Sequence, residues 1–164
     1  MPETTQEEEL DLRFLSAVRD LPRAAPVRPG EGLGAGTVLT GEQAIALFDA
    51  QAGSRHLDLA ARYLRSEGHG FYTIGSAGHE ADAAVGAALR PSDPALVHYR
   101  SGAFDLARAA QVPGSEPLRD VLLGLVGASD EPIAGGRHKV FGNHALAVIP
   151  QTSTIASHLS LIHI

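Results

Sequence analysis

The chain of 164 residues contains no cysteine and no tryptophan, and aromatic residues make up only 5% of it. Without cysteine, neither a disulfide framework nor a thiolate zinc site is possible. This absence is typical of cytosolic proteins, so we expect a cytoplasmic location. Large side chains are few and glycines number 18, so we expect a core in which backbones pack close together. We also expect room for ligands near the glycine turns.

The composition also restricts the partners. The formal net charge is −6 at pH 7, which disfavours binding to the phosphate backbone of a nucleic acid. No apolar run approaches the roughly 20 residues of a membrane span. The acidic N-terminus, MPETTQEEE, lacks the basic-then-apolar order of a signal peptide. With 44% hydrophobic residues, the chain is globular rather than disordered, and we expect neither nucleic acid nor membrane as a partner.

The apolar spacing predicts a helix-rich α/β arrangement. Five segments have helical spacing: 4–18, 40–68, 79–89, 102–111 and 118–126. Gly53 is the weak point of the long second segment, and a break or kink there would be unsurprising. Two short apolar runs, 95–97 and 145–149, have the length of buried strands. This order predicts the first part of an α/β fold with a parallel sheet.

The first strand run ends on a group of anion-binding side chains. His98, Tyr99 and Arg100 follow it directly, and then come Ser101 and the start of a helix. A guanidinium, a phenol, a hydroxyl and free N–H groups at a positive helix end together favour an anion, with a cofactor pyrophosphate as the natural ligand. The alternative is an arginine that caps a neighbouring helix beside a half-buried tyrosine. This stretch alone leaves both interpretations open.

Hydroxyl side chains follow the second strand run. They belong to Thr152, Ser153, Thr154 and Ser157. Because ligands of a parallel sheet bind beyond the carboxyl ends of its strands, we hypothesise that this turn and the Tyr99–Arg100 corner face one crevice. The alternative is a pair of ordinary Ser/Thr helix N-caps.

Metal and substrate contacts are less clearly marked. The eight histidines show no compact ligand pattern with aspartate or glutamate, so no metal site is predicted. The loop Arg137-His138-Lys139 is basic, and we expect it to approach a carboxylate substrate or a phosphate, with His138 as the candidate contact. A solvated basic loop is the alternative. No catalytic residue is assigned from these patterns.

Three segments together resemble one enzyme family. They read GFYTIGSAGHEADAAVGAAL (70–89), ALVHYRSGAFDLARA (95–109) and GGRHKVFGNHALAVIPQTSTIASHL (135–159). In order and spacing they resemble the alpha part of the E1 component of thiamine-diphosphate-dependent 2-oxo acid dehydrogenases, with the branched-chain type nearest. The resemblance covers roughly 40–159, and its specific parts are the Tyr-Arg pair followed by glycine and the QTSTIASHL turn.

The resemblance implies a thiamine-diphosphate-binding α/β fold with a parallel sheet, of which this chain is the truncated, helix-rich N-terminal half. Tyr99 and Arg100 match the pair that contacts the diphosphate. Ser153 and Ile155 match the turn that lines the cofactor. In some relatives that turn also binds a monovalent cation, at the positions of Thr152, Thr154 and Ser157. The family's Gly-Asp-Gly motif and later asparagine, which hold Mg²⁺, are absent from this chain.

The resemblance also implies an organisation and a reaction. We expect an acidic helix and linker over 1–36, the N-terminal half of the cofactor domain over 37–159, and a non-native tail over 160–164. The family decarboxylates a branched-chain 2-oxo acid and passes the acyl group to a lipoyl domain of the E2 component. The E1 beta part, separate or fused, supplies the activating carboxylate, so the fragment alone is expected to be inactive. Pyruvate or acetoin dehydrogenase, or a non-catalytic α/β binding module, are the alternatives.

Overall fold

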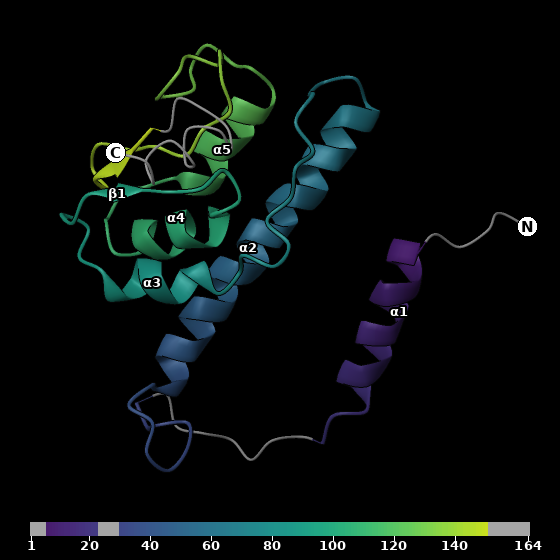
Figure 1. Cartoon of the computed structure of the whole chain (residues 1–164), viewed down its shortest axis with the longest axis vertical. Helices are drawn as coiled ribbons and strands as arrows, with labels where there is room; N and C mark the ends of the chain where they lie inside the picture. Colours follow the sequence, from purple (N-terminus) through teal and green to yellow (C-terminus); the bar gives the residue numbers. More distant parts are fainter. Residues whose placement is uncertain (1–5, 23–29, 151–164) are drawn as a thin grey trace, which may run out of the picture. The chain divides into compact units, whose positions relative to one another are not determined.

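The structure of the chain, a computed structural model, describes residues 6–22 and 30–150. It divides into two compact units, Met1–Gly41 and Glu42–Ile164. The first unit contains helix α1 (Gln6–Arg19) and a turn in which Gly32 and Thr40 form an antiparallel bridge. The other helices and both strands belong to the second unit, apart from Gly41 at the start of the second helix (Figure 1). In the described part of the chain, no helix combines the length and the apolar character that crossing a membrane requires.

The long helix predicted to start at Thr40 is present as α2 (Gly41–Ser66), and it runs unbroken through Gly53. The helix is therefore not broken at this glycine. A Cβ at Gly53 would lie 3.4 Å from Leu106 Cδ1 and 3.8 Å from Leu118 Cδ2. Both distances are ordinary van der Waals contacts, so Leu106 and Leu118 pack against α2 at this glycine.

Three shorter helices follow, α3 (Asp82–Ala88), α4 (Gly102–Ala109) and α5 (Pro117–Leu125). Helices α3 and α4 pack closely, because a Cβ at Gly86 would lie only 2.5 Å from the carbonyl oxygen of Phe104. Ala83 and Ala103 are fully buried in the same contact. Of the small residues of α3, Ala83 and Gly86 are the buried ones.

The two predicted strands pair in parallel, as expected. β1 (Ala95–Leu96) and β2 (Val148–Ile149) align Ala95 with Val148 and Leu96 with Ile149. Each strand is only two residues long, so the described residues form five helices with a small parallel sheet, and this arrangement does not itself assign a fold. The second strand is shorter than predicted because Asn143 exchanges two backbone hydrogen bonds with Val148, which closes a tight turn before the strand.

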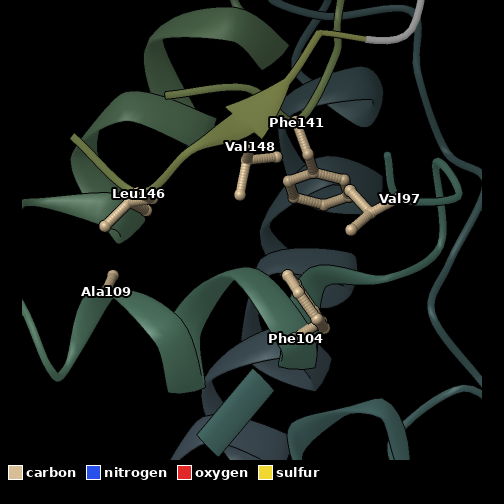
Figure 2. Close-up of a cluster of buried hydrophobic side chains, with 6 residues drawn as sticks. All are labelled: Val97, Phe104, Ala109, Phe141, Leu146 and Val148. Atoms are coloured by element: carbon tan, nitrogen blue, oxygen red, sulfur yellow. The ribbon is translucent and has the colours of Figure 1, made fainter. Parts of the chain in front are cut away.

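The core lies between α4 and the segments that carry the strands. Figure 2 shows Phe104 and Ala109 of α4 facing the side chains of Phe141, Leu146 and Val148, with Val97 beside them. Arg108 of α4 is fully buried next to this cluster. Its Nη1 donates to the backbone carbonyls of Asp93 at 2.6 Å and Leu146 at 3.1 Å.

The contact between α3 and α4 provides a test of the packing. We expect Gly86→Ala to destabilise the protein by about 1–3 kcal/mol, because the new methyl group collides with a backbone oxygen that cannot rotate away. Gly124→Ala on α5 is the matched control, since a Cβ there meets nothing closer than 3.6 Å. It should leave stability unchanged or raise it by up to about 1 kcal/mol. Urea unfolding of both variants measures the difference, and equal stabilities would contradict the described packing.

Candidate functional site

The Tyr99–Arg100 corner lies between β1 and the start of α4. The Nη1 atom of Arg100 donates to the carbonyl of Gly75, and the backbone N–H of Arg100 donates to His98 Nδ1 at 3.2 Å. The guanidinium carbon lies 5.5 Å from the centroid of the Tyr99 ring. The side chain of Arg100 therefore binds a loop carbonyl. This differs from the alternative in which the arginine caps a neighbouring helix.

That loop is held in place by Asp58 on α2. Its Oδ2 accepts hydrogen bonds from the backbone N–H of Ser76 at 2.8 Å, from Ser76 Oγ at 2.8 Å and from Arg55 Nη1 at 2.7 Å. Figure 1 shows the chain running back along α2 before it reaches α3. Because Asp58 fixes Ser76, it also fixes the adjacent carbonyl of Gly75 that receives Arg100.

Two histidines join the same loop to the corner. The rings of His79 and His98 stack with centroids 5.3 Å apart and planes 7° from parallel. Ser101 Oγ donates to Asp82 Oδ2 at 2.8 Å, and His79 Nδ1 lies 4.0 Å from the same oxygen. Nothing local in the sequence predicts this stack, because its two members are 19 positions apart.

A small cavity of about 20 Å³ lies beside Tyr99 and Arg100, which is room for a single water molecule. Lys139, Tyr72 and Ser76 also line it. The buried Oη of Tyr72 has no hydrogen-bond partner among the described residues. Burial, more than any neighbouring charge, raises the pKa of Tyr72 to about 12, so this phenol keeps its proton and is available as a donor.

Lys139, from the basic loop 137–139, lines this cavity against two aromatic rings. Its ammonium nitrogen lies 3.8 Å from the ring centroid of Phe141 and 4.9 Å from that of Tyr72. Burial lowers the pKa of Lys139 to about 8, while the charges of Asp105 and Asp58 act in the opposite direction. A cation held against two aromatic faces is stabilised by their π-electrons, and it gives the site a second positive group beside Arg100.

The remaining predicted site residues fall into two groups. Ser153, Ile155, Thr152, Thr154 and Ser157 lie outside the described residues. His138 is exposed and lines a separate, larger cavity of about 360 Å³ that does not include Tyr99 or Arg100. Within residues 6–22 and 30–150, no three histidines, aspartates or glutamates are grouped to hold a metal ion.

No protein-family model, no curated protein and no solved structure matches this chain. β1 and β2 pair in parallel, so the chain leaves Leu96 and Ile149 at the same edge of the sheet.

Asp105 of α4 gives the site region a pH-dependent stability. The pKa of this carboxyl is raised to about 6, mainly by burial, with Lys139 and Arg108 opposing the shift and Asp120 contributing to it. Its Oδ1 has no hydrogen-bond partner among the described residues. Between about pH 4 and pH 6 the folded chain keeps a proton that the unfolded chain releases, so the free energy of unfolding falls as the pH rises.

We expect Asp105→Asn to remove this dependence. Relative to wild type, the variant should gain about 2–3 kcal/mol of stability between pH 4 and pH 7. Asp49→Asn, at an exposed position of α2, serves as the control and should follow the wild-type pH curve. Urea unfolding at several pH values measures the effect. A stability difference between Asp105→Asn and wild type that stays constant with pH would contradict the assignment.

Proposed function

We propose that the chain is part of the E1 alpha portion of a thiamine-diphosphate-dependent 2-oxo acid dehydrogenase, with a branched-chain 2-oxo acid as the substrate class. In this proposal Tyr99 and Arg100 bind the diphosphate of the cofactor. The observation that supports it best is that Tyr99 and Arg100 follow a strand of a parallel pair and precede helix α4. Ligands of parallel sheets bind at that edge, and the start of a helix attracts phosphate.

The donors around the small cavity suit a diphosphate in their chemistry. Arg100 uses Nη1 for the Gly75 carbonyl, and a guanidinium carries five N–H donors in all. The phenol of Tyr72 and the ammonium of Lys139 line the same space. The volume of about 20 Å³ is far below that of a cofactor, so binding requires the contact between Arg100 and Gly75 to open.

Each residue has a defined part in the proposal. Arg100 neutralises diphosphate charge through charge-assisted hydrogen bonds, and Tyr99 flanks it. Ser153 and Ile155 line the cofactor from the sequence that follows β2, and Thr152, Thr154 and Ser157 hold a monovalent cation. When bound, thiamine diphosphate supplies the carbanion and the electron sink that decarboxylation needs.

Other groups come from outside this chain in the proposal. The Mg²⁺ ligands and the carboxylate that activates the cofactor belong to segments that this sequence does not contain, the carboxylate to the E1 beta part. The lipoyl domain of E2 accepts the acyl group. Pyruvate and acetoin dehydrogenases remain alternatives with respect to substrate, because the described residues do not form a substrate pocket that separates them.

A non-catalytic α/β binding module is the second candidate function. The observation that favours it is the small volume beside Arg100, about 20 Å³, which is room for a water molecule but not for a cofactor. In this case the contacts of Arg100 and of Asp58 with Ser76 fix the loop before α3 to the corner after β1. The two candidates differ in one measurable property, the affinity for thiamine diphosphate.

Replacement of Arg100 tests the proposal. We expect Arg100→Ala in the full-length protein to weaken thiamine diphosphate binding about 10- to 100-fold, because a charge-assisted contact contributes roughly 1.5–3 kcal/mol. Isothermal titration calorimetry in the presence of Mg²⁺ measures the dissociation constants. Arg100→Ala also removes the hydrogen bond to Gly75. Thermal unfolding without cofactor, recorded in parallel, measures how much stability is lost with that bond alone.

Arg119→Ala is the matched control for this experiment. Arg119 lies on α5 with an exposed side chain and long ion pairs of 3.8 and 3.9 Å to Glu116 and Asp120, so its replacement removes the same charge at the surface. Its affinity should equal that of wild type. Equal affinity of Arg100→Ala and wild type would remove the proposed site, and absence of binding to wild type would favour the non-catalytic module.

A further inference from the structure

The larger cavity, of about 360 Å³, has a volume typical of small-molecule sites. Its walls come from three segments, 69–72, 124–127 and 136–139. Tyr72, Leu125 and Lys139 line both this cavity and the small one beside Arg100. The two spaces are therefore adjacent, yet Tyr99 and Arg100 line only the small one.

Close backbone packing forms part of the wall. A Cβ at Gly136 would lie 2.4 Å from the carbonyl carbon and oxygen of Gly127, and both glycines have positive φ, 71° and 66°. The buried carboxylate of Glu131 accepts backbone N–H bonds from Ile133, Ala134 and Gly136, the first at 2.9 Å and the last at 3.3 Å. The loop that precedes Arg137 is thus held by its own internal hydrogen bonds.

The charges around this cavity have one sign. Four described lining side chains are basic: His69, Arg137, His138 and Lys139. None of the described lining residues is acidic, although the whole chain has a net charge of −6. Arg137 Nη1 donates to the carbonyl of Ala134 at 3.3 Å, which fixes one side of its guanidinium. Arg137 and Lys139 carry positive charge, and a cavity with such charges and no acidic lining residue raises the local concentration of anions.

The cavity also has an apolar side. Phe71 is 95% exposed and Val126 is 43% exposed, and both line it beside the buried Leu125. We infer that this cavity binds a small organic anion, with its phosphate or carboxylate group against Arg137, His138 and Lys139 and its apolar body against Phe71 and Val126. The inference does not depend on the proposed cofactor, because it does not involve Arg100.

Titration with phenyl phosphate tests this site directly. We expect saturable binding to the full-length protein, with amide chemical shifts that change at Gly127, Gly136 and Lys139 rather than at Arg100. Arg137→Ala should weaken the affinity about fivefold or more through loss of a charge-assisted contact. Raising the salt concentration should weaken it as well. Arg119→Ala, which removes the same charge elsewhere, should leave the affinity unchanged.

Two further probes identify the ligand chemistry. Inorganic phosphate should bind more weakly than phenyl phosphate, because it lacks the apolar body, and phenylacetate distinguishes a carboxylate from a phosphate ligand. His138→Ala provides a second variant at an exposed position. Absence of saturable binding by either organic anion, equal affinity for inorganic phosphate and phenyl phosphate, or shifts centred on Arg100 would each overturn the inference. An equal loss of affinity in Arg137→Ala and Arg119→Ala would do the same.

Discussion

A buried guanidinium connects the parts of the chain on which the candidate site depends. Arg108 is fully buried in α4, and it donates to the carbonyls of Asp93 and Leu146. These residues stand two positions before β1 and two positions before β2. By binding both, Arg108 aligns the starts of the two strands, and the parallel register then brings their carboxyl ends to one edge. The guanidinium also lies 4.7 Å from the Phe104 ring, which partly compensates for its burial.

The same helix carries a second buried charge. Asp105 lies one turn before Arg108, and Lys139 approaches it from the loop between α5 and β2. The region thus contains two cations and one carboxyl group that are largely removed from water. Such groups are costly to bury unless they are paired, and their unused donors and acceptors, Arg108 Nε, Arg108 Nη2 and Asp105 Oδ1, have no partner among the described residues. Polar atoms of this kind often mark functional regions rather than stabilising cores.

Local patterns in the sequence predict much of the described fold. Helical spacing indicates α2, α4 and α5 to within a few residues, because their apolar positions recur with the helical period. The short apolar runs indicate both strands and their parallel pairing. Other features depend on contacts that no local pattern contains. Leu106 packs against the unbroken helix at Gly53, and Asn143 shortens the second strand by pairing with Val148.

Some features of the candidate site follow from local sequence, and others depend on contacts between distant segments. The position of Tyr99 and Arg100 between a strand and a helix is a local property, so the sequence predicts it. The stack of His79 on His98 and the placement of Lys139 against Tyr72 and Phe141 arise only when distant segments meet. One signal was available for Asp105. It stands among apolar residues in GAFDLARA, three positions before Arg108, which is a spacing that places two charges on one face of a helix.

The most direct test of the central proposal asks whether one diphosphate contacts both strand ends. Amide chemical shifts of the full-length protein should be followed during titration with thiamine diphosphate and Mg²⁺. If the two ends share the ligand, the amides of Tyr99, Arg100, Ser153 and Ile155 shift together and give a single dissociation constant. Shifts at only one of the two ends, or at Arg137 to Lys139 alone, would contradict a shared diphosphate site.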